Sequence, residues 1–220
     1  MDDSTTPASR TRATRESILR AATRVFARYG YDGGSLDKIS RAAKSVDRMI
    51  YYYFGSKEGL FIAVLEDMYR RMGEAEMRLE LDPRDPVASL ETVIRFVFRY
   101  YRRHPEFIVL LNTENMHRGR HLPKSPRARA PGEHFPSPTM GAVARLLETG
   151  REQGLFRRGP AARDVYLMIL ATGYFYVSNR YTLSRFLGED MDTEEAQGEW
   201  EDFVVETVLR TVSTPKRLEH

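Results

Sequence analysis

Residues 35–61 read SLDKISRAAKSVDRMIYYYFGSKEGLF, and their pattern is the strongest local indication of the fold. The part from 35 to 43 is a short helical pattern that begins with Ser35, a residue type suited to cap a helix N-terminus. After a break at Lys44 and Ser45, a second short helical pattern spans about 46–54. Two short helices joined by so tight a turn predict a helix-turn-helix over residues 35–54.

The second short helix has two unlike faces. The face that we expect to pack inward consists of Val46, Ile50, Tyr53 and Phe54. The face that is turned outward consists of Arg48, Tyr51 and Tyr52.

Longer helices are expected on both sides of this pair. Upstream, apolar residues recur at three- and four-residue steps over about 14–29, and Gly30 is placed as the helix stop. Downstream, Ser56 is placed to cap a long helix over about 57–80. The proline-rich segment 82–86 ends that helix, because proline lacks an N–H donor and disfavours helix in the residue before it.

The rest of the chain continues the helical pattern, and no alternating strand run interrupts it. Further helices are predicted over 87–103, 105–117, 138–153, 163–187 and 193–213. The stretch 118–137 is rich in Pro, Arg and Gly and is expected to be a mobile loop. Helix 163–187 is apolar nearly all round, so it must be covered on more than one side. The predicted fold class is all-α.

The composition excludes some kinds of stabilising and metal-binding chemistry. The chain has 220 residues, of which 41% are apolar, so it can bury a substantial core and needs no disulfides or metal ions to fold. It has no cysteine, which excludes disulfides and thiolate metal ligands and fits a reducing cytoplasm. The polar start MDDSTTPASRTRATRE is neither a signal peptide nor a membrane anchor, so we expect a soluble, cytoplasmic protein. The end Leu218-Glu219-His220 looks like the start of a vector-encoded tag.

Positive charge is concentrated at one end of the chain. Residues 1–60 hold 11 Lys and Arg against 7 Asp and Glu, a net of +4, and since the whole chain is +3 the remainder is −1. This is a modest electrostatic footprint for nucleic acid. A solvated basic helix face gives the same count, so charge alone leaves both interpretations open.

Residues 14–61 resemble the DNA-binding domain of the TetR family throughout, with the family's spacing between blocks. The resemblance is carried by Thr14–Leu19, Phe26–Tyr31, Ile39–Ala43 and Ile50–Phe61. The later segments 111–122 and 154–157 resemble more weakly the branch of that family that includes the pyrimidine-utilisation regulator. Shared architecture in this half does not imply a shared effector.

The resemblance implies an architecture and a function. The expected parts are a disordered arm at 1–13, a three-helix helix-turn-helix domain at 14–60, an effector-binding and dimerisation domain at 61–215, and a tail at 216–220. The expected function is sequence-specific transcription regulation, by a homodimeric repressor that a small-molecule effector releases from an inverted-repeat DNA operator. No cofactor and no enzyme activity are expected.

One departure from the family lies in the turn. The family usually has Gly and then Val-Ser there, whereas this chain reads Lys44-Ser45-Val46. If Lys44 must adopt positive φ, the conformation costs about 1 kcal/mol relative to glycine. The aim of the following helix can therefore differ from the family's.

The expected DNA contacts come from both short helices and the residues that flank them. Arg48 can donate two hydrogen bonds to guanine, and Asp47 is expected to orient it rather than to accept from cytosine. Met49 meets a thymine methyl or packs. The side chains expected at phosphates are Ser35, Lys38, Ser45, Tyr51, Tyr52 and Lys57. For these the alternatives are that the tyrosines fill the core, Ser35 only caps and Lys57 is only solvated.

Two further surfaces are implied by the family. A four-helix dimer interface is expected to use Tyr166, Leu170, Tyr174, Phe203, Val204, Thr207 and Val208, and the alternative is that they complete the monomer core. An effector pocket is expected to be lined by Phe96, Tyr100, Phe107, Leu111, Glu114, Asn115 and Tyr174, although aromatic stripes are more often core.

Other functional classes fit less well. The segment 30–34 lacks the Gly-Lys-Ser/Thr of a phosphate loop, and no nucleophile elbow is present. Glu114, His117 and His121 have the spacing of metal ligands on one helical face, but a capped helix end is the preferred interpretation, and no metal is expected. An adaptor with a degenerate helix-turn-helix is the third class, and only the missing turn glycine favours it.

Overall fold

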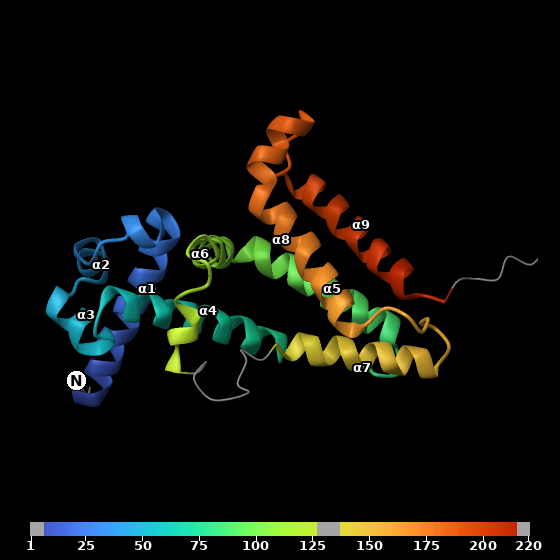
Figure 1. The fold of residues 1–220 in the computed structure, drawn as a ribbon, viewed down its shortest axis with the longest axis horizontal. Coiled ribbons are helices and arrows are strands. Elements are labelled where there is room, and N and C mark those ends of the chain that lie inside the picture. Colours follow the sequence, from blue (N-terminus) through green and yellow to red (C-terminus); the bar gives the residue numbers. More distant parts are fainter. Residues whose placement is uncertain (1–6, 127–136, 215–220) are drawn as a thin grey trace, which may run out of the picture. The chain divides into compact units, whose positions relative to one another are not determined.

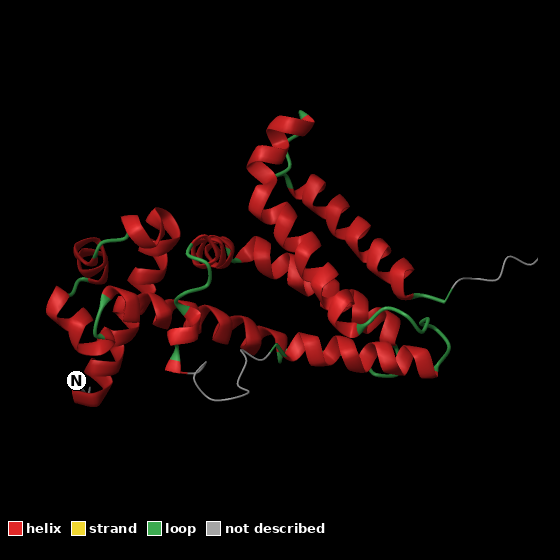
Figure 2. Cartoon of the chain, in the orientation of Figure 1, coloured by secondary structure: helices red, strands yellow, loops and turns green. Residues whose placement is uncertain are grey.

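The computed structural model describes residues 7–126 and 137–214, and within these ranges the chain is helical, as predicted (Figures 1 and 2). The α-helices are α1 Pro7–Gly33, α2 Leu36–Ala43, α3 Asp47–Phe54, α4 Lys57–Glu76, α5 Pro86–Arg103, α6 Pro105–Met116, α7 Pro138–Glu152, α8 Ala162–Leu187 and α9 Glu194–Val212. One 3-10 turn, η1 Leu122–Lys124, follows α6. The only strand-like pairing in the described ranges is an isolated bridge between Phe156 and Ser213.

Most helix boundaries fall within two residues of the prediction, and the exceptions are both ends of α1 and the end of α4. Helix α1 begins at Pro7, where the sequence analysis expected a disordered arm up to residue 13. A proline in the first helical turn explains this start, because its missing N–H would be unpaired there in any case. Helix α4 ends at Glu76 rather than near residue 80. Residues 1–6, much of the loop expected at 118–137, and the tail at 216–220 lie outside the described residues.

Gly30 ends the regular part of α1, as expected. Its φ of 67° and ψ of −179° break the helix, and one further turn leads to Gly33. At Gly34 a side chain could not be accommodated, because a Cβ there would lie 2.6 Å from Cδ1 of Phe26. The glycines therefore let the chain fold back tightly against α1 before α2 begins.

The chain packs into two compact units that are not contiguous in sequence. The first contains residues 1–71 and 106–135, and the second contains residues 72–105 and 136–220. The expected division placed one boundary near residue 60 and left everything after it in a single domain. The structure instead assigns α6 and the segment after it to the unit that contains the helix-turn-helix.

The core of the first unit is built by α1 to α4. Ile18 and Phe26 of α1, Ile39 of α2, Ile50 of α3 and Phe61 of α4 are fully buried. The rings of Phe26 and Phe61 meet edge to face at 5.1 Å, an arrangement that aromatic pairs favour. These contacts join the two short helices to the two long ones.

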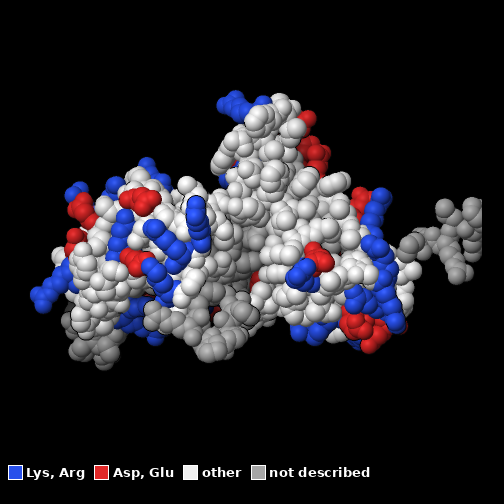
Figure 3. Space-filling model, in the orientation of Figure 1, with Lys and Arg blue, Asp and Glu red and all other residues white. Residues whose placement is uncertain are grey.

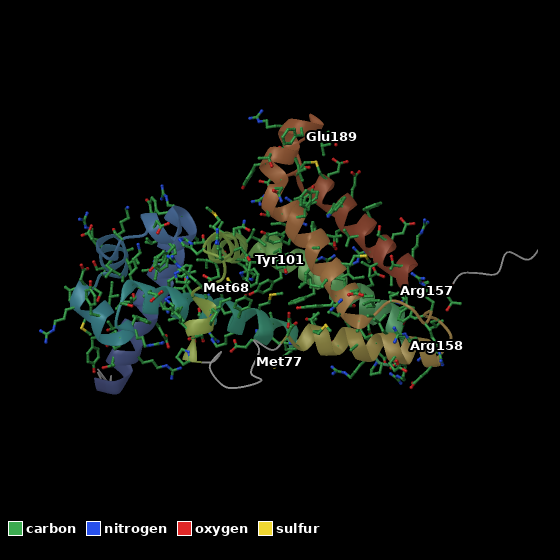
Figure 4. All side chains as sticks on the ribbon, in the orientation of Figure 1. Met68, Met77, Tyr101, Arg157, Arg158 and Glu189 are labelled. Atoms are coloured by element: carbon green, nitrogen blue, oxygen red, sulfur yellow. The ribbon has the colours of Figure 1, made fainter. Side chains whose placement is uncertain are left out.

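The second unit is built around α5, which contacts α7, α8 and α9. Helix α8 approaches α5 closely at Gly173, where a Cβ would lie 3.4 Å from Cδ2 of Tyr101 (labelled in Figure 4) and 3.7 Å from Cδ2 of Phe98. On the α9 side, the buried Glu201 receives hydrogen bonds from Arg95 at 2.9 Å and Arg99 at 3.0 Å. Apolar packing and a hydrogen-bonded charge cluster thus hold α5 from different sides.

A buried carboxylate holds the N-terminus of α7. Glu76, at the end of α4, accepts hydrogen bonds from the Ser137 hydroxyl at 3.3 Å and the Thr139 N–H at 3.3 Å. Tyr166 of α8 donates to the Ser137 hydroxyl at 2.8 Å. Burial raises the pKa of Glu76 above its ordinary value, and these hydrogen bonds oppose the shift without cancelling it.

We predict that Glu76→Gln stabilises the protein at neutral and alkaline pH. A carboxyl whose pKa is raised by folding contributes most stability below its ordinary pKa and loses it as pH rises through the folded-state value. The amide avoids that loss, since it stays neutral and still accepts hydrogen bonds through its oxygen. The melting temperature of the variant should exceed the wild-type value at pH 8, and the difference should vanish toward pH 4.

The matched control is Glu80→Gln, which changes an exposed glutamate close by in the sequence and should leave the melting temperature unchanged at both pH values. A variant Glu76→Gln that is less stable than wild type at pH 8 would show that the negative charge itself stabilises α7.

Candidate nucleic-acid interface

The turn between α2 and α3 is fixed by caps at both ends of α2. Ser35 is the N-cap, and its hydroxyl accepts from the Lys38 N–H at 3.3 Å, which confirms the expected capping role. At the other end Lys44 adopts φ 52° and ψ 44°, a left-handed conformation, which meets the condition that the sequence left open. The Ser45 N–H then donates to the Ser40 carbonyl at 2.9 Å. The turn keeps a glycine-type geometry without a glycine.

Helix α3 presents most of its side chains to solvent. Ile50 is its one fully buried side chain, whereas Tyr51 is 55% and Tyr52 is 74% exposed. Arg48 is exposed on the same side, and Met49 is half-buried. Around the first unit, Lys and Arg side chains project from the surface with some Asp and Glu among them (Figure 3).

Val46 does not lie on the buried face, which corrects the sequence analysis. It is the N-cap of α3, with φ −119° and ψ 151°, and it is 62% exposed. The error came from extending helical spacing one residue too far, because an N-cap has extended backbone angles and its side chain leaves the helical register. The inward face of α3 consists of Ile50 with the half-buried Tyr53 and Phe54.

Arg48 and Asp47 form no ion pair with each other or with any other residue in the described ranges. The role expected for Asp47, holding Arg48 in position, is therefore not realised in this structure. Both side chains are exposed at the start of α3 and can reorient towards a ligand.

The two lysines expected at phosphates fold back onto the aromatic end of α1. Lys57 lies over the Tyr31 ring at 4.7 Å and donates to the Asp32 carbonyl at 3.3 Å. Lys38 lies over the Tyr29 ring at 4.8 Å and donates to the Gly33 carbonyl at 3.0 Å. Both ammonium groups thus lie at the end of α1, beside the helix-turn-helix.

The structure brings together only part of the expected effector set. A groove of about 440 Å³ in the second unit is lined by Phe96 and Tyr100 of that set, together with Ala75, Leu79, Thr92, Arg95, Arg99, Arg103 and His104. Tyr174 lies half-buried on α8 in the same unit. The remaining four, Phe107, Leu111, Glu114 and Asn115, lie on α6 in the first unit.

Glu114 was expected to line the effector pocket, but in the structure it holds the chain segment that follows α6. Its carboxylate is buried and accepts from the backbone N–H groups of His121 at 2.8 Å and Leu122 at 3.0 Å. The other oxygen lies 2.6 Å from Nδ1 of the fully buried His121. Asn115, by contrast, is exposed and donates its amide to the Leu111 carbonyl. The neighbouring positions 114 and 115 therefore face different environments.

His117 completes this arrangement from the next turn. Its Nε2 lies 3.3 Å from an Asp32 carboxylate oxygen, and its ring packs against Tyr31 at 5.5 Å. Among the described residues, no group of three or more His, Asp or Glu side chains is arranged to hold a metal ion. The spacing of Glu114, His117 and His121 therefore corresponds to the end of α6 docked on the end of α1.

The residues expected at the dimer interface differ in burial: some lie in the core of the subunit, and others are half-buried or exposed. Val204 and Val208 are buried within the subunit, so they complete its core, which was the alternative interpretation. Tyr166 is half-buried and bonded to Ser137. Phe203 is exposed, and Leu170, Tyr174 and Thr207 are half-buried. Helical spacing on α8 and α9 did not reveal which face each helix turns inward.

Sequence reasoning also missed exposed apolar residues on α8. Leu167 and Phe175, both more than half exposed, share a side of the helix with Ala171 at four-residue steps. They could have been found from the unbroken apolar character of the helix, which has more apolar faces than one subunit covers.

Comparisons with known proteins agree on one family. Residues 18–64 match the model described as bacterial regulatory proteins, tetR family, and residues 86–208 match a tetracyclin repressor-like C-terminal domain. The chain is 46% identical to the HTH-type transcriptional repressor NicS of Pseudomonas putida over 197 residues, which are 90% of this chain and 91% of NicS. It is 31% identical to the transcriptional regulator RutR of Escherichia coli K12 over 94 residues, or 43% of this chain and 44% of RutR.

A solved structure supports the same fold. A TetR family transcription regulator from Marinobacter aquaeolei VT8 superimposes with a TM-score of 0.63 at 19% identity, covering 94% of this chain and all of that one. Within the part of the chain that the structure describes, no helix has the length and apolar character needed to cross a membrane.

We predict that Lys44→Gly stabilises the protein by about 0.5–1 kcal/mol. Glycine removes a left-handed penalty of about 1–2 kcal/mol, and about 0.4–1 kcal/mol of that gain is offset by the greater freedom of the unfolded chain. The measurement is the free energy of unfolding in denaturant. The control Ala42→Gly, inside α2, should destabilise by about 1 kcal/mol. Equal losses for both variants would contradict a left-handed Lys44.

Proposed function

Because the chain belongs to the TetR family of DNA-binding transcriptional regulators, and not to an enzyme family, we propose that it is a homodimeric repressor of an inverted-repeat operator. A small-molecule effector releases it from that operator. Repression is favoured by the name of NicS, a repressor with which this chain shares 46% identity.

The observation that carries the proposal is the surface of α3. An eight-residue helix that buries one side chain and exposes Arg48, Tyr51 and Tyr52 has a shape that fits the major groove. We assign base readout to Arg48, whose guanidinium has no partner among the described residues. The tyrosine hydroxyls suit phosphate oxygens.

Backbone contacts are proposed at the rim of the helix-turn-helix. Lys38 and Lys57 need only swing away from their aromatic rings to meet phosphates, since both are held at the surface by weak cation–π and carbonyl contacts. Ser35 and Ser45 flank the same surface. Ser35 caps α2 by accepting through a lone pair of its hydroxyl oxygen, so the hydroxyl hydrogen remains available to donate to a phosphate oxygen.

Dimerisation follows from how little DNA one such unit can contact. The surface that we propose for it consists of Leu167, Leu170, Ala171, Tyr174, Phe175, Phe203 and Thr207 on α8 and α9, which we call the α8–α9 face. Its members are apolar or small and lie on two helices that pack side by side. Association of two copies through this face would form a four-helix interface and space two α3 helices for an inverted repeat.

Effector control is proposed to act on the spacing of the two α3 helices. The groove beside Phe96 and Tyr100 is the candidate effector site in the second unit. An effector can release DNA only by binding more tightly to the conformation that misfits the operator.

We predict that the purified protein retains specific genomic fragments and that Arg48→Ala weakens that binding by at least tenfold. A bidentate arginine–guanine contact contributes about 1–3 kcal/mol per half-site. Binding to the retained fragment, followed by fluorescence anisotropy, should also weaken steeply as salt rises, because phosphate contacts release counterions.

Arg210→Ala is the matched control, since Arg210 is an exposed arginine of α9 paired with Glu206 and should leave operator affinity unchanged. Undiminished, sequence-selective binding by both Arg48→Ala and Tyr51→Phe would refute the assignment of α3. A protein that retains no genomic fragment would refute the regulator function.

We predict that Phe203→Asp converts the dimer into a monomer. Phe203 is exposed in the subunit, so the substitution should not disturb the fold, but a buried carboxylate at the dimer interface is strongly unfavourable. Sedimentation velocity measures the mass. Met77→Asp, at an exposed methionine outside the α8–α9 face, should stay dimeric. A Phe203→Asp variant that remains dimeric would place the interface elsewhere.

A further inference from the structure

We propose that Val46 reads the methyl group of a thymine in the major groove, and so is a specificity-determining residue of the operator complex. This inference rests on the proposed DNA-binding function, and it names a chemical feature that the operator must contain. The contact would be made by an apolar side chain at the N-cap of α3, near Arg48, to which guanine readout is assigned.

Val46 has no structural reason to be valine. It is 62% exposed, so it contributes little to the core. It is also the N-cap of α3, and its side chain makes no capping hydrogen bond. Serine, threonine, aspartate or asparagine at an N-cap is worth about 1 kcal/mol more than a residue that cannot accept. The sequence thus forgoes stability at this position and exposes two methyl groups to water.

The backbone fixes where those methyl groups lie. The left-handed Lys44 turns the chain after α2, and the extended angles of Val46, φ −119° and ψ 151°, follow two residues later. The Val46 carbonyl accepts the first helical hydrogen bond, from the Met49 N–H at 2.9 Å. Its side chain therefore stands at the N-terminal end of α3, next to the exposed Asp47 and Arg48.

That end is the part of a recognition helix that meets base edges. An isopropyl group can neither donate nor accept a hydrogen bond, so it gains nothing from the polar atoms of the groove. The apolar group that a standard base pair presents in the major groove is the C5-methyl of thymine. Contact between the two removes both from water, and the chemistry of the exposed side chain therefore selects thymine.

The test uses the shortest operator duplex that footprinting defines on the retained genomic fragment. A set of duplexes replaces each thymine in turn by deoxyuridine, which keeps the base pair and deletes only the methyl group. We expect one position per half-site at which this change weakens wild-type binding about fourfold, the ratio that corresponds to burying one methyl-sized group. The other substitutions should have smaller effects.

Val46→Ala removes the contact from both half-sites, so it should weaken binding to the unmodified duplex by about the square of that factor, roughly sixteenfold, and should lose its sensitivity to deoxyuridine at that position. Such loss of sensitivity identifies the pair in direct contact, in the manner of a double-mutant cycle. The matched control is Val109→Ala, at another exposed valine, on α6; it should bind like wild type and stay sensitive to the missing methyl.

A second variant separates readout from stability. Val46→Ser supplies the missing cap and should raise the melting temperature by about 2–4 °C, while it should bind the operator more weakly because it lacks the methyl groups. A purely structural valine would instead lower the melting temperature when replaced.

Three results would overturn the inference. Wild-type binding that is specific but insensitive to every deoxyuridine substitution would exclude methyl readout while leaving the proposed function intact. Retained sensitivity in Val46→Ala would assign the methyl to another side chain. Absence of any specific DNA binding by the wild type would remove the proposed function itself, and the readout with it.

Discussion

One buried side chain, Ile50, attaches the exposed helix α3 to its domain. Around it the backbone is constrained on both sides, by the left-handed Lys44 before the helix and by Gly55 after it, where φ is 74°. With so little apolar surface to bury, α3 depends on these turns for its direction. Phe26, Ile39 and Phe61 of the neighbouring helices are fully buried, as Ile50 is. The orientation of the proposed DNA-reading surface thus depends on local backbone geometry, together with Ile50 and the half-buried Tyr53 and Phe54.

Much of this arrangement could be predicted from the sequence. Helical periodicity, proline positions and caps such as Ser35 and Ser56 gave the order and the extent of the helices. The largest boundary errors occurred at both ends of α1 and after Glu76. The left-handed conformation of Lys44 stayed an open condition at the level of the sequence, because a turn that lacks the usual glycine can also be reshaped.

Other features depended on tertiary packing that periodicity does not encode. Val46 was assigned to the wrong face because capping geometry takes its side chain out of the helical register. Val204 and Val208 were expected at a dimer interface but lie in the subunit core, since both helices α8 and α9 carry more than one apolar face. Helical spacing grouped Glu114 with His117 and His121, but His121 lies beyond the end of α6 at Met116, so spacing alone could not show that Glu114 holds the segment after the helix.

The docking of α6 on the end of α1 determines where the first unit can be divided into fragments. Tyr31 packs against Phe61 at 4.9 Å and His121 at 4.8 Å, and His121 in turn is held by Glu114. A fragment that stopped after residue 71 would lack His121 and Glu114, and it would leave one side of Tyr31 open to water. The unit that contains the helix-turn-helix is therefore not one continuous stretch of the chain, and a cut after residue 71 divides it. A fragment that keeps this unit whole must also include the segment that begins at Glu106.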